Sequence, residues 1–426
     1  MLDTFRNAWK SPELRSKIIY TLLVIIAFRI GAAITVPFLN LTSLHQEIAS
    51  GGNSLMGYID ILTGGAMSRA TIFSMSVTPY INATIVIQLL SVAIPPLERL
   101  SKEGEVGRKK LNSITRIVTM FFGLAQGVAM YLYLNHEGIT EYSSGFSAIF
   151  SGIIIVLVFT AGSCLMMWLG EQINDKGIGN GISVLLFAGI ISRGPSLVSS
   201  IGKYWQIGGK YYVLIPILIA LSFFVIVAIV FMNDAERRIP IQYAKRVVGR
   251  KMYGGQSSYF PVKVTMSGVM PIIFASSIVS VPSIIGGYLP KSWTIYKIFT
   301  WFGYTSWFYA VVYFILIVLF NFFYVAIQYN PYEISNNIRK NNGGIPGIRP
   351  GKPTAEFIQR VITRVTLIGA LFLAIVAVLP IAISAGAGLN IALGGTSLLI
   401  LVGVALDTAR QLESQMMMRH YKGFLD

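Results

Sequence analysis

Ten long apolar windows constrain the fold of this 426-residue chain more than any other feature. A helix needs about 20 mainly apolar residues to cross the hydrocarbon core of a bilayer. Charged residues make up 12% of the chain, about half the share found in soluble domains. The sequence therefore predicts an all-α polytopic membrane protein with ten transmembrane helices, and it excludes a water-soluble enzyme and a disordered chain. The windows are residues 18–36, 72–94, 114–134, 149–169, 180–200, 212–232, 266–289, 306–328, 360–380 and 391–409.

The basic residues fall mainly on one side of this predicted topology. Ten spans place both termini on the same side, and the segments on that side hold 27 Lys and Arg against 6 on the other. Short loops with such an excess stay in the cytoplasm. We therefore expect both termini, including the tail 410–426, to be cytoplasmic. The net charge of +16 is interpreted as a mark of topology rather than of nucleic-acid binding.

Ten spans divide into two sets of five, at residues 1–205 and 206–426. Because five is odd, a duplicated five-helix unit would lie inverted relative to its copy, as in many channels and transporters. The second window of each half contains proline, at Pro79 in the first half and at Pro271 and Pro282 in the second. Each proline alone could mark an ordinary kink. Interrupted helices at matching places indicate a substrate path, because irregular backbone at membrane depth is tolerated only inside protein or along a cavity.

A short apolar segment at about residues 55–65 lies between the first two windows. It is too short to span a bilayer, so we interpret it as a re-entrant helix. An amphipathic helix on the outer surface is the alternative, and periodicity does not separate the two. The side chains that share its apolar face and the glycines that end it are Leu55, Tyr58, Ile59, Leu62, Gly64 and Gly65.

Two predicted cytoplasmic loops, about residues 233–265 and 329–358, are longer than a connection requires. The first alternates apolar and polar residues in a hairpin pattern with a turn near Gly254-Gly255, and the second holds an irregular loop of Gly, Asn and Pro around Arg349. Attraction to anionic lipids, worth about 1 kcal/mol per charge, needs neither feature. We therefore favour docking of a large acidic or phosphate-bearing partner, for which RNA would qualify. The basic residues concerned are Lys245, Arg246, Arg250, Lys251 and Arg349.

No catalytic, metal or cofactor site is recognisable in the sequence. The three histidines fall in predicted loops or the tail without metal-ligand spacing, and Cys164 has no second cysteine to pair with. No nucleotide-binding P-loop and no nucleophile elbow is present. The windows contain one carboxylate, Asp407, whereas ion-coupled carriers usually bury several such groups. A small-solute carrier and an intramembrane protease are thus the less favoured alternatives, and we predict a protein that is not an enzyme and needs no cofactor.

Six motifs are spread from the first loop to the last window: GGAMSRA, TPYINATIVIQLL, EQINDKGIGNGIS, GVMPIIFASS, GIRPGKPTAEF and GGTSLLILVGVALD. Together they resemble the SecY family, the central subunits of bacterial protein-translocation channels. The resemblance implies two five-helix halves around a pore that passes unfolded polypeptide across the cytoplasmic membrane and releases membrane segments sideways into lipid. It also implies the partners SecE and SecG, the ATPase SecA or the ribosome, and the signal sequence of a preprotein.

The resemblance further assigns roles to residues of this chain. The segment at 55–65 would be a plug, and Arg349 with the basic loop residues would bind SecA or the ribosome. A lateral gate would open at a seam that contains Asn82, Gln88 and Thr265. An aliphatic ring would close the pore, and an apolar constriction of this kind resists ions by dewetting. Its members would be Val77, Ile81, Ile182, Leu186, Ile273 and Ile400, with Val77 and Leu186 where the family has isoleucine.

Overall fold

The computed structural model describes residues 9–44, 65–142, 145–209, 211–243, 246–248, 251–253, 257–287, 301–303, 306–387 and 395–422. The predicted plug residues other than Gly65 lie outside these ranges, as do Lys245 and Arg250. For Arg246 and Lys251 the strand backbone alone is described.

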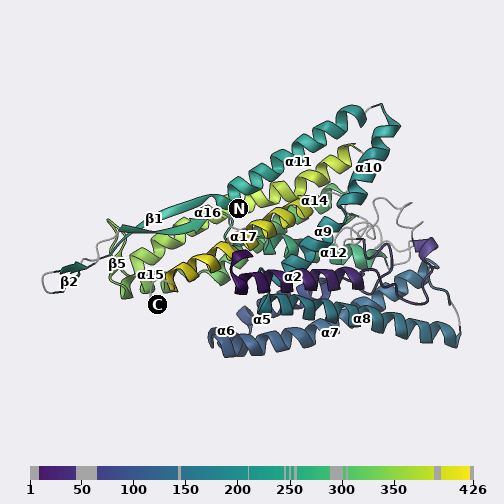
Figure 1. The fold of residues 1–426 in the computed structure, drawn as a ribbon, viewed down its shortest axis with the longest axis horizontal. Helices are drawn as coiled ribbons and strands as arrows, with labels where there is room; N and C mark the ends of the chain where they lie inside the picture. The colour runs from purple at the N-terminus through teal and green to yellow at the C-terminus, as the bar shows by residue number, and fades with distance from the viewer. Residues whose placement is uncertain are drawn as a thin grey trace.

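A helix lies at each of the ten predicted windows (Figure 1). The first half holds α2 (Pro12–Gly31), α5 (Thr78–Ala93), α7 (Glu105–His136), α8 (Phe146–Lys176) and α9 (Gly181–Ser192), the last followed at once by α10 (Gly194–Ile207). The second half holds α11 (Tyr211–Asp234), α12 (Met270–Gly287), α14 (Trp307–Gln328), α16 (Lys352–Ala387) and α17 (Gly395–Lys422).

Six helices of the described ranges are long and apolar enough to cross a membrane, or seven if α5 and the short α6 (Pro95–Lys102) form one span bent by 102°. The other predicted spans fall short for local reasons. α2 carries charged residues near both ends, and the apolar part of α12 is the short stretch Met270–Pro282. In α17 the apolar stretch ends at Leu406, before Asp407 and Arg410. The chain is thus a multi-pass membrane protein whose layout is consistent with ten spanning helices.

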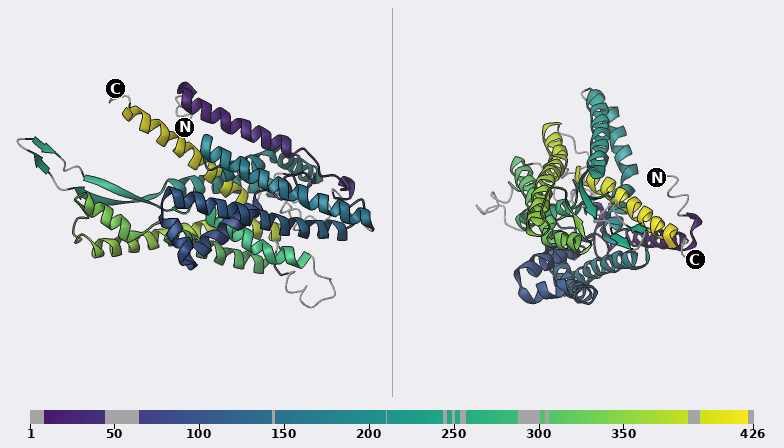
Figure 2. Two further views of the ribbon diagram at one scale, coloured as in Figure 1. Left: turned by 90° about the horizontal axis from the view of Figure 1, so that it is seen from below. Right: turned by 90° about the vertical axis from the view of Figure 1, so that its left-hand side faces the viewer.

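The helices form two bundles that meet in the middle of the molecule (Figures 1 and 2). α2, α5, α7 and α8 lie together on one side, and α11, α14, α16 and α17 lie on the other, with α9 and α12 between them. α2 begins and α17 ends toward the same end of the bundles. This is the arrangement of termini that an even number of spans requires.

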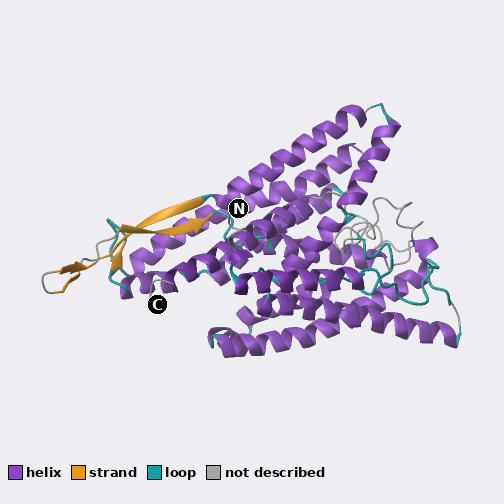
Figure 3. Cartoon of the chain, viewed as in Figure 1, coloured by secondary structure: helices purple, strands orange, loops and turns teal. Residues whose placement is uncertain are grey.

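A small sheet projects from that same end (Figure 3). β1 (Glu236–Tyr243) pairs antiparallel with β4 (Ser257–Lys263), with Ile239 opposite Phe260, and with the two-residue β5 (Gly343–Gly344). β2 (Arg246–Val248) and β3 (Lys251–Tyr253) continue the hairpin. The hairpin prediction is therefore confirmed. The predicted turn near Gly254-Gly255 is wrong, because Val248 pairs with Lys251 and the chain reverses between them.

The second long loop contains a helix that the pattern did not predict, α15 (Pro331–Lys340). Asn330 caps it by accepting hydrogen bonds from the backbone N–H groups of Tyr332 and Glu333. Its buried Ile338 joins Ile239 and Ile241 of β1 and Ile358 of α16 in one apolar cluster. The sheet, α15 and the first part of α16 therefore form a single packed unit at the end of the bundles from which the sheet projects.

Candidate functional site

All six residues of the predicted ring lie in one buried apolar cluster at the centre of the molecule. Val77 and Ile81 come from the start of α5, Ile182 and Leu186 from α9, Ile273 from α12 and Ile400 from α17. Each side chain is at most 8% exposed. The pairs four residues apart share a helix face, as their spacing indicated. Four helices, two from each half, thus meet in one cluster of aliphatic side chains.

Two turn segments bring α5 and α12 to this cluster. We call residues 72–77 the N-terminal lead-in and residues 264–269 the C-terminal lead-in, and each is six residues of turn directly before the helix. Pro79 and Pro271 therefore stand in the first turn of their helices, where proline is well tolerated, and Pro282 lies within α12. The sequence expectation that proline interrupts these spans is corrected: the irregular backbone precedes the prolines.

The two lead-ins make equivalent contacts in the two halves. The N–H of Ile72 donates to the carbonyl of Ile34, just after α2, and the N–H of Val264 donates to that of Ala235, just after α11. A Cβ added at Gly162 of α8 would lie 2.0 Å from the backbone oxygen of Ile72. One added at Gly369 of α16 would lie 2.2 Å from that of Val264. Glycine at both places lets the lead-ins pass close to the fourth helix of each half.

The fifth residue of each lead-in has a positive φ, +51° at Ser76 and +62° at Gly268. The side-chain bonds differ. Ser74 donates to the carbonyls of Ala66 and Thr71, in the chain just before the lead-in. Thr265 donates to Asn233 of α11 at 2.7 Å, and Ser267 donates to Asn321 of α14 at 2.9 Å. Sequence reasoning missed Asn233 and Asn321. Asn321 is an amide within the apolar window 306–328, whereas Asn233 directly follows the window 212–232.

The three predicted gate residues do not share one environment. α5 and α12 pack against each other, and Asn82 and Gln88 are half-buried on α5. The hydroxyl of Thr265 is bonded to α11 of its own half. Thr265 also lines a cavity together with Asn180 and Ser183 of the first half.

A polar cavity of about 360 Å³ lies between the ring and the sheet. Val404 of α17 belongs both to its lining and to the apolar cluster around the ring. Arg410 closes one side by donating to the carbonyl of Asn233 and pairing with the carboxylate of Asp234. Other polar residues that line the cavity are Asn180, Ser183, Lys263, Thr265, Ser267, Gln328, Asp407 and Thr408. A chain approaching the ring from the sheet side would therefore meet polar side chains before apolar ones.

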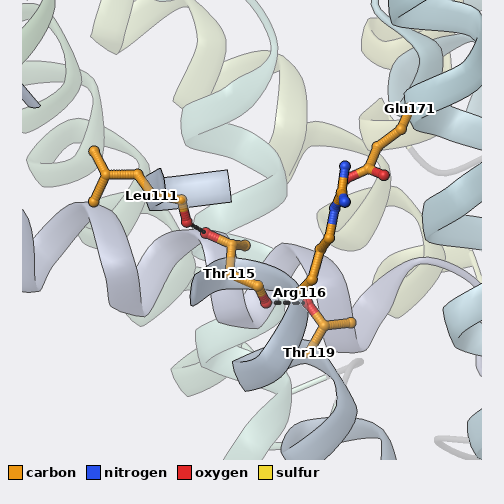
Figure 4. A network of polar contacts seen from close by, with 5 residues as sticks. All are labelled: Leu111, Thr115, Arg116, Thr119 and Glu171. Atoms are coloured by element: carbon orange, nitrogen blue, oxygen red, sulfur yellow. Dashed lines mark hydrogen bonds and ion pairs between the residues drawn. The ribbon is translucent and has the colours of Figure 1, made fainter. Parts of the chain in front are cut away.

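The motif EQINDKGIGNGIS connects the end of α8 to α7 and to the start of α9. Glu171 forms an ion pair of 2.8 Å with Arg116 of α7 (Figure 4). Thr115, next to Arg116, and Thr119, three residues further on, bond their hydroxyls to the backbone of α7. The side chain of Asn174 accepts from the N–H of Gly181, which begins α9. This motif therefore holds α9, and with it two ring residues, in place.

The predicted docking loops present basic groups on a rigid support. Arg238 of β1 forms an ion pair of 2.7 Å with Glu236 and lies 4.8 Å from the ring centroid of Tyr259. The hydrogen bond to Glu236 raises the pKa of Arg238. Arg349 is exposed, while its backbone oxygen accepts from Thr354 and the nearby Gly351 oxygen accepts from Ser335. These bonds fix the turn and leave the Arg349 side chain directed at solvent.

Within the described ranges, no group of three or more His, Cys, Asp and Glu side chains is arranged to hold a metal ion. The sheet side and the ring are therefore described by charge, hydrogen bonding and packing alone.

Comparison with known proteins was made over the whole chain. The family model described as SecY matches residues 71–409. The protein translocase subunit SecY of Thermotoga maritima is 44% identical over 430 residues, 100% of this chain and 98% of that protein. Its counterpart from Streptomyces galbus is 41% identical over 446 residues, 100% of each.

Solved structures share the fold at low sequence identity. One described as a protein conducting channel has a TM-score of 0.66 at 18% identity, with 94% of this chain and 92% of that chain covered. Sec61 in a canine ribosome-channel complex has a TM-score of 0.62 at 17% identity, with the same coverage. These likenesses confirm the predicted fold class and the resemblance on which the site residues were assigned.

Proposed function

Because the chain belongs to the SecY family of protein translocase subunits, we propose that it is a protein-conducting channel closed by the aliphatic ring. It translocates unfolded secretory polypeptides across the bacterial cytoplasmic membrane and releases membrane segments into lipid. The convergence of Val77, Ile81, Ile182, Leu186, Ile273 and Ile400 in one buried cluster carries the proposal. Residues 1–205 and 206–426 are the two halves that contribute to this ring.

An aliphatic ring suits this function for a physical reason. Apolar constrictions exclude ions because water leaves them. Aliphatic side chains also have no hydrogen bonds to break when they rearrange around a passing polypeptide. The plug at about 55–65, ended by Gly64 and Gly65, adds a second seal on the outer side.

The gate is proposed to open between α5 and α7 on one side and α12 and α14 on the other. α5 and α12 meet at the seam, where Asn82 and Gln88 contribute polar side chains. Hydrogen bonds between membrane helices average about 0.6 kcal/mol, so a seam of this kind separates reversibly.

The sheet and α15 form the proposed docking surface for SecA or the ribosome. Arg349 is held on a fixed turn, and Arg246 and Lys251 begin the strands β2 and β3. Lys245 and Arg250 directly precede them in the sequence. Sec61, a solved relative of the same fold, is part of a ribosome-channel complex, and ribosomal RNA supplies the phosphate that such arginines bind. Energy for transport comes from these partners, because the chain itself is proposed to be a channel and not an enzyme.

Both termini and the sheet are proposed to be cytoplasmic, which the distribution of Lys and Arg supports. SecE and SecG are the proposed membrane subunits of the complex. Anionic lipids are proposed to bind the basic residues close to the membrane surface.

The test places a single cysteine at Ile81 after replacement of Cys164 by Ser, in vesicles that hold the channel complex. A precursor with one cysteine is stalled during SecA-driven translocation. We expect a disulfide at Ile81 that depends on ATP and on the signal sequence. A cysteine at Phe121, 71% exposed on the outside of α7, is the matched control and stays unlinked.

Failure to link Ile81, Ile182 and Ile273, with the precursor shown to be stalled across the membrane, would contradict the ring assignment. Uptake of a small solute along its gradient by the purified protein would instead support a carrier.

A further inference from the structure

Asn321 occupies a place on α14 where packing alone would favour an apolar residue. It stands in a buried stripe with Tyr313, Ile317 and Val325, spaced four residues apart, and is 2% exposed. Its Oδ1 accepts the hydrogen bond from Ser267, while its Nδ2 has no hydrogen-bond partner among the described residues. An unpaired buried donor destabilises a fold, so a group of this kind calls for an explanation beyond packing.

Ser267, the hydrogen-bond partner of Asn321, lies shortly before α12, the helix that carries the ring residue Ile273. Ser267 is 3% exposed and is followed by Gly268, with its positive φ, and then by α12. Early in α12, Phe274 packs edge-on against Phe320 and Tyr324 of α14, at centroid distances of 6.2 and 6.3 Å. α12 is therefore joined to α14 at two points, one aromatic and one polar, with the ring residue Ile273 just before the aromatic contact.

The opposite flank of the C-terminal lead-in is held in the same way. Thr265 donates to Asn233 of α11, and the carbonyl of Asn233 accepts from Arg410 of α17. Asparagines of α11 and α14 thus both accept hydrogen bonds from the C-terminal lead-in. The N-terminal lead-in contrasts with this, since the hydroxyl of Ser74 bonds to backbone carbonyls of residues just before it and not to a side chain of another helix.

We infer that Asn321 is a positioning residue for the pore ring: through Ser267 it holds the C-terminal lead-in against α14 and so sets where Ile273 stands. The inference rests on the proposed channel function. A single hydrogen bond between membrane helices changes an equilibrium by about threefold. This hydrogen bond, which we call the clamp, therefore favours the observed position of α12 and yields when a translocating chain displaces this helix.

The first experiment measures where α12 stands. Spin labels are placed at the exposed Val92 of α5 and Val281 of α12 in the full-length Cys164→Ser chain in lipid nanodiscs, and their distance distribution is recorded by electron paramagnetic resonance. Ser267→Ala is expected to raise the population outside the wild-type distribution about threefold. Ser267→Thr keeps the hydroxyl and is expected to restore the wild-type distribution.

Ser276→Ala is the matched control, because Ser276 is also a buried serine of this region but donates to the carbonyl of Ile273 in its own helix. It is expected to leave the distances unchanged. The inference is overturned if Ser267→Ala behaves as wild type, or if Ser276→Ala shifts the distribution equally.

The second experiment distinguishes an effect on the position of α12 from an effect on the stability of the fold. The double variant Ser267→Ala/Asn321→Leu removes both partners together, which leaves no polar group unpaired. A positioning role predicts the same shift in distance with an unchanged or raised Tm. A lowered Tm with unshifted distances would show that the pair only stabilises the fold.

Polypeptide translocation by the wild-type chain is measured in parallel. If the wild-type chain translocates no polypeptide, the proposed function is contradicted, while the distances between the spin labels still describe the fold. Normal translocation with no effect of Ser267→Ala on the distances would overturn the clamp alone.

Discussion

The two lead-ins have the same backbone path and different attachments. Each begins with an N–H bonded to the chain just after the first helix of its half, passes a glycine of the fourth helix and turns with a positive φ at its fifth residue. The buried serine hydroxyl of the N-terminal lead-in bonds to backbone carbonyls just before it in the chain, whereas the C-terminal lead-in bonds to asparagines of α11 and α14. The inverted architecture therefore determines the backbone course of both lead-ins. Individual side chains determine how firmly each lead-in is bonded to the adjacent helices.

The largest expected effect comes from the two glycine contacts. Gly162→Ala and Gly369→Ala each force a Cβ against a backbone oxygen and should lower the free energy of unfolding by about 1–3 kcal/mol. We expect the larger loss at Gly162, because its added Cβ would lie 2.0 Å from the backbone oxygen, against 2.2 Å at Gly369. Thermal unfolding in detergent measures both. Gly202→Ala of α10, with nothing within 4 Å of the added Cβ, is the control, and a loss there equal to that at Gly162 would contradict the steric account.

Substitutions at the fifth residue of each lead-in should change the free energy of unfolding in opposite directions. Ser76→Gly removes a side chain from the left-handed region and should raise the free energy of unfolding by up to about 1 kcal/mol. Gly268→Ala introduces that strain and should lower it by about 1 kcal/mol. The same unfolding measurement checks both variants. Two changes of equal sign would show that the backbones of the lead-ins are not equivalent.

A smaller effect is expected from the coupling between Thr265 and Asn233. Thr265→Val and Asn233→Ala, measured singly and together, should give an interaction energy of about 0.6 kcal/mol. Thr71→Val is the control, because its hydroxyl bonds to the carbonyl of Ala66 and no side chain of another helix is involved. Thr71→Val and Asn233→Ala should add without interaction. A coupling as large as that of the Thr265 pair would argue against a local bond.

The smallest effect is expected at the ion pair between Arg116 and Glu171 in the first half. The side chain of Arg116 is 54% exposed, so screening by solvent limits the pair to about 0.5 kcal/mol or less. Arg116→Met should lower stability by that amount at low salt, and the difference should shrink at 1 M salt. A salt-independent loss would assign the effect to packing of the long side chain instead.

Much of the molecule could be predicted from local pattern. Residue hydropathy located a helix at each of the ten windows, because crossing a bilayer demands a continuous apolar stretch of defined length. Alternation along residues 239–243 predicted the hairpin, since successive side chains of a strand point to opposite faces. The motifs of the SecY family led to the six ring residues that the fold brings together.

Tertiary structure alone decided how the helices that carry the ring are held. Thr265 and Asn233 are 32 residues apart in sequence, and Ser267 and Asn321 are 54 apart, so no local periodicity links them. The proline positions suggested interruptions inside helices, whereas the irregular backbone lies before them, where carbonyl oxygens face glycines of distant helices. Hydropathy is a property of each residue and is legible in the chain; a hydrogen bond or a close backbone approach needs two partners, and folding alone brings them together.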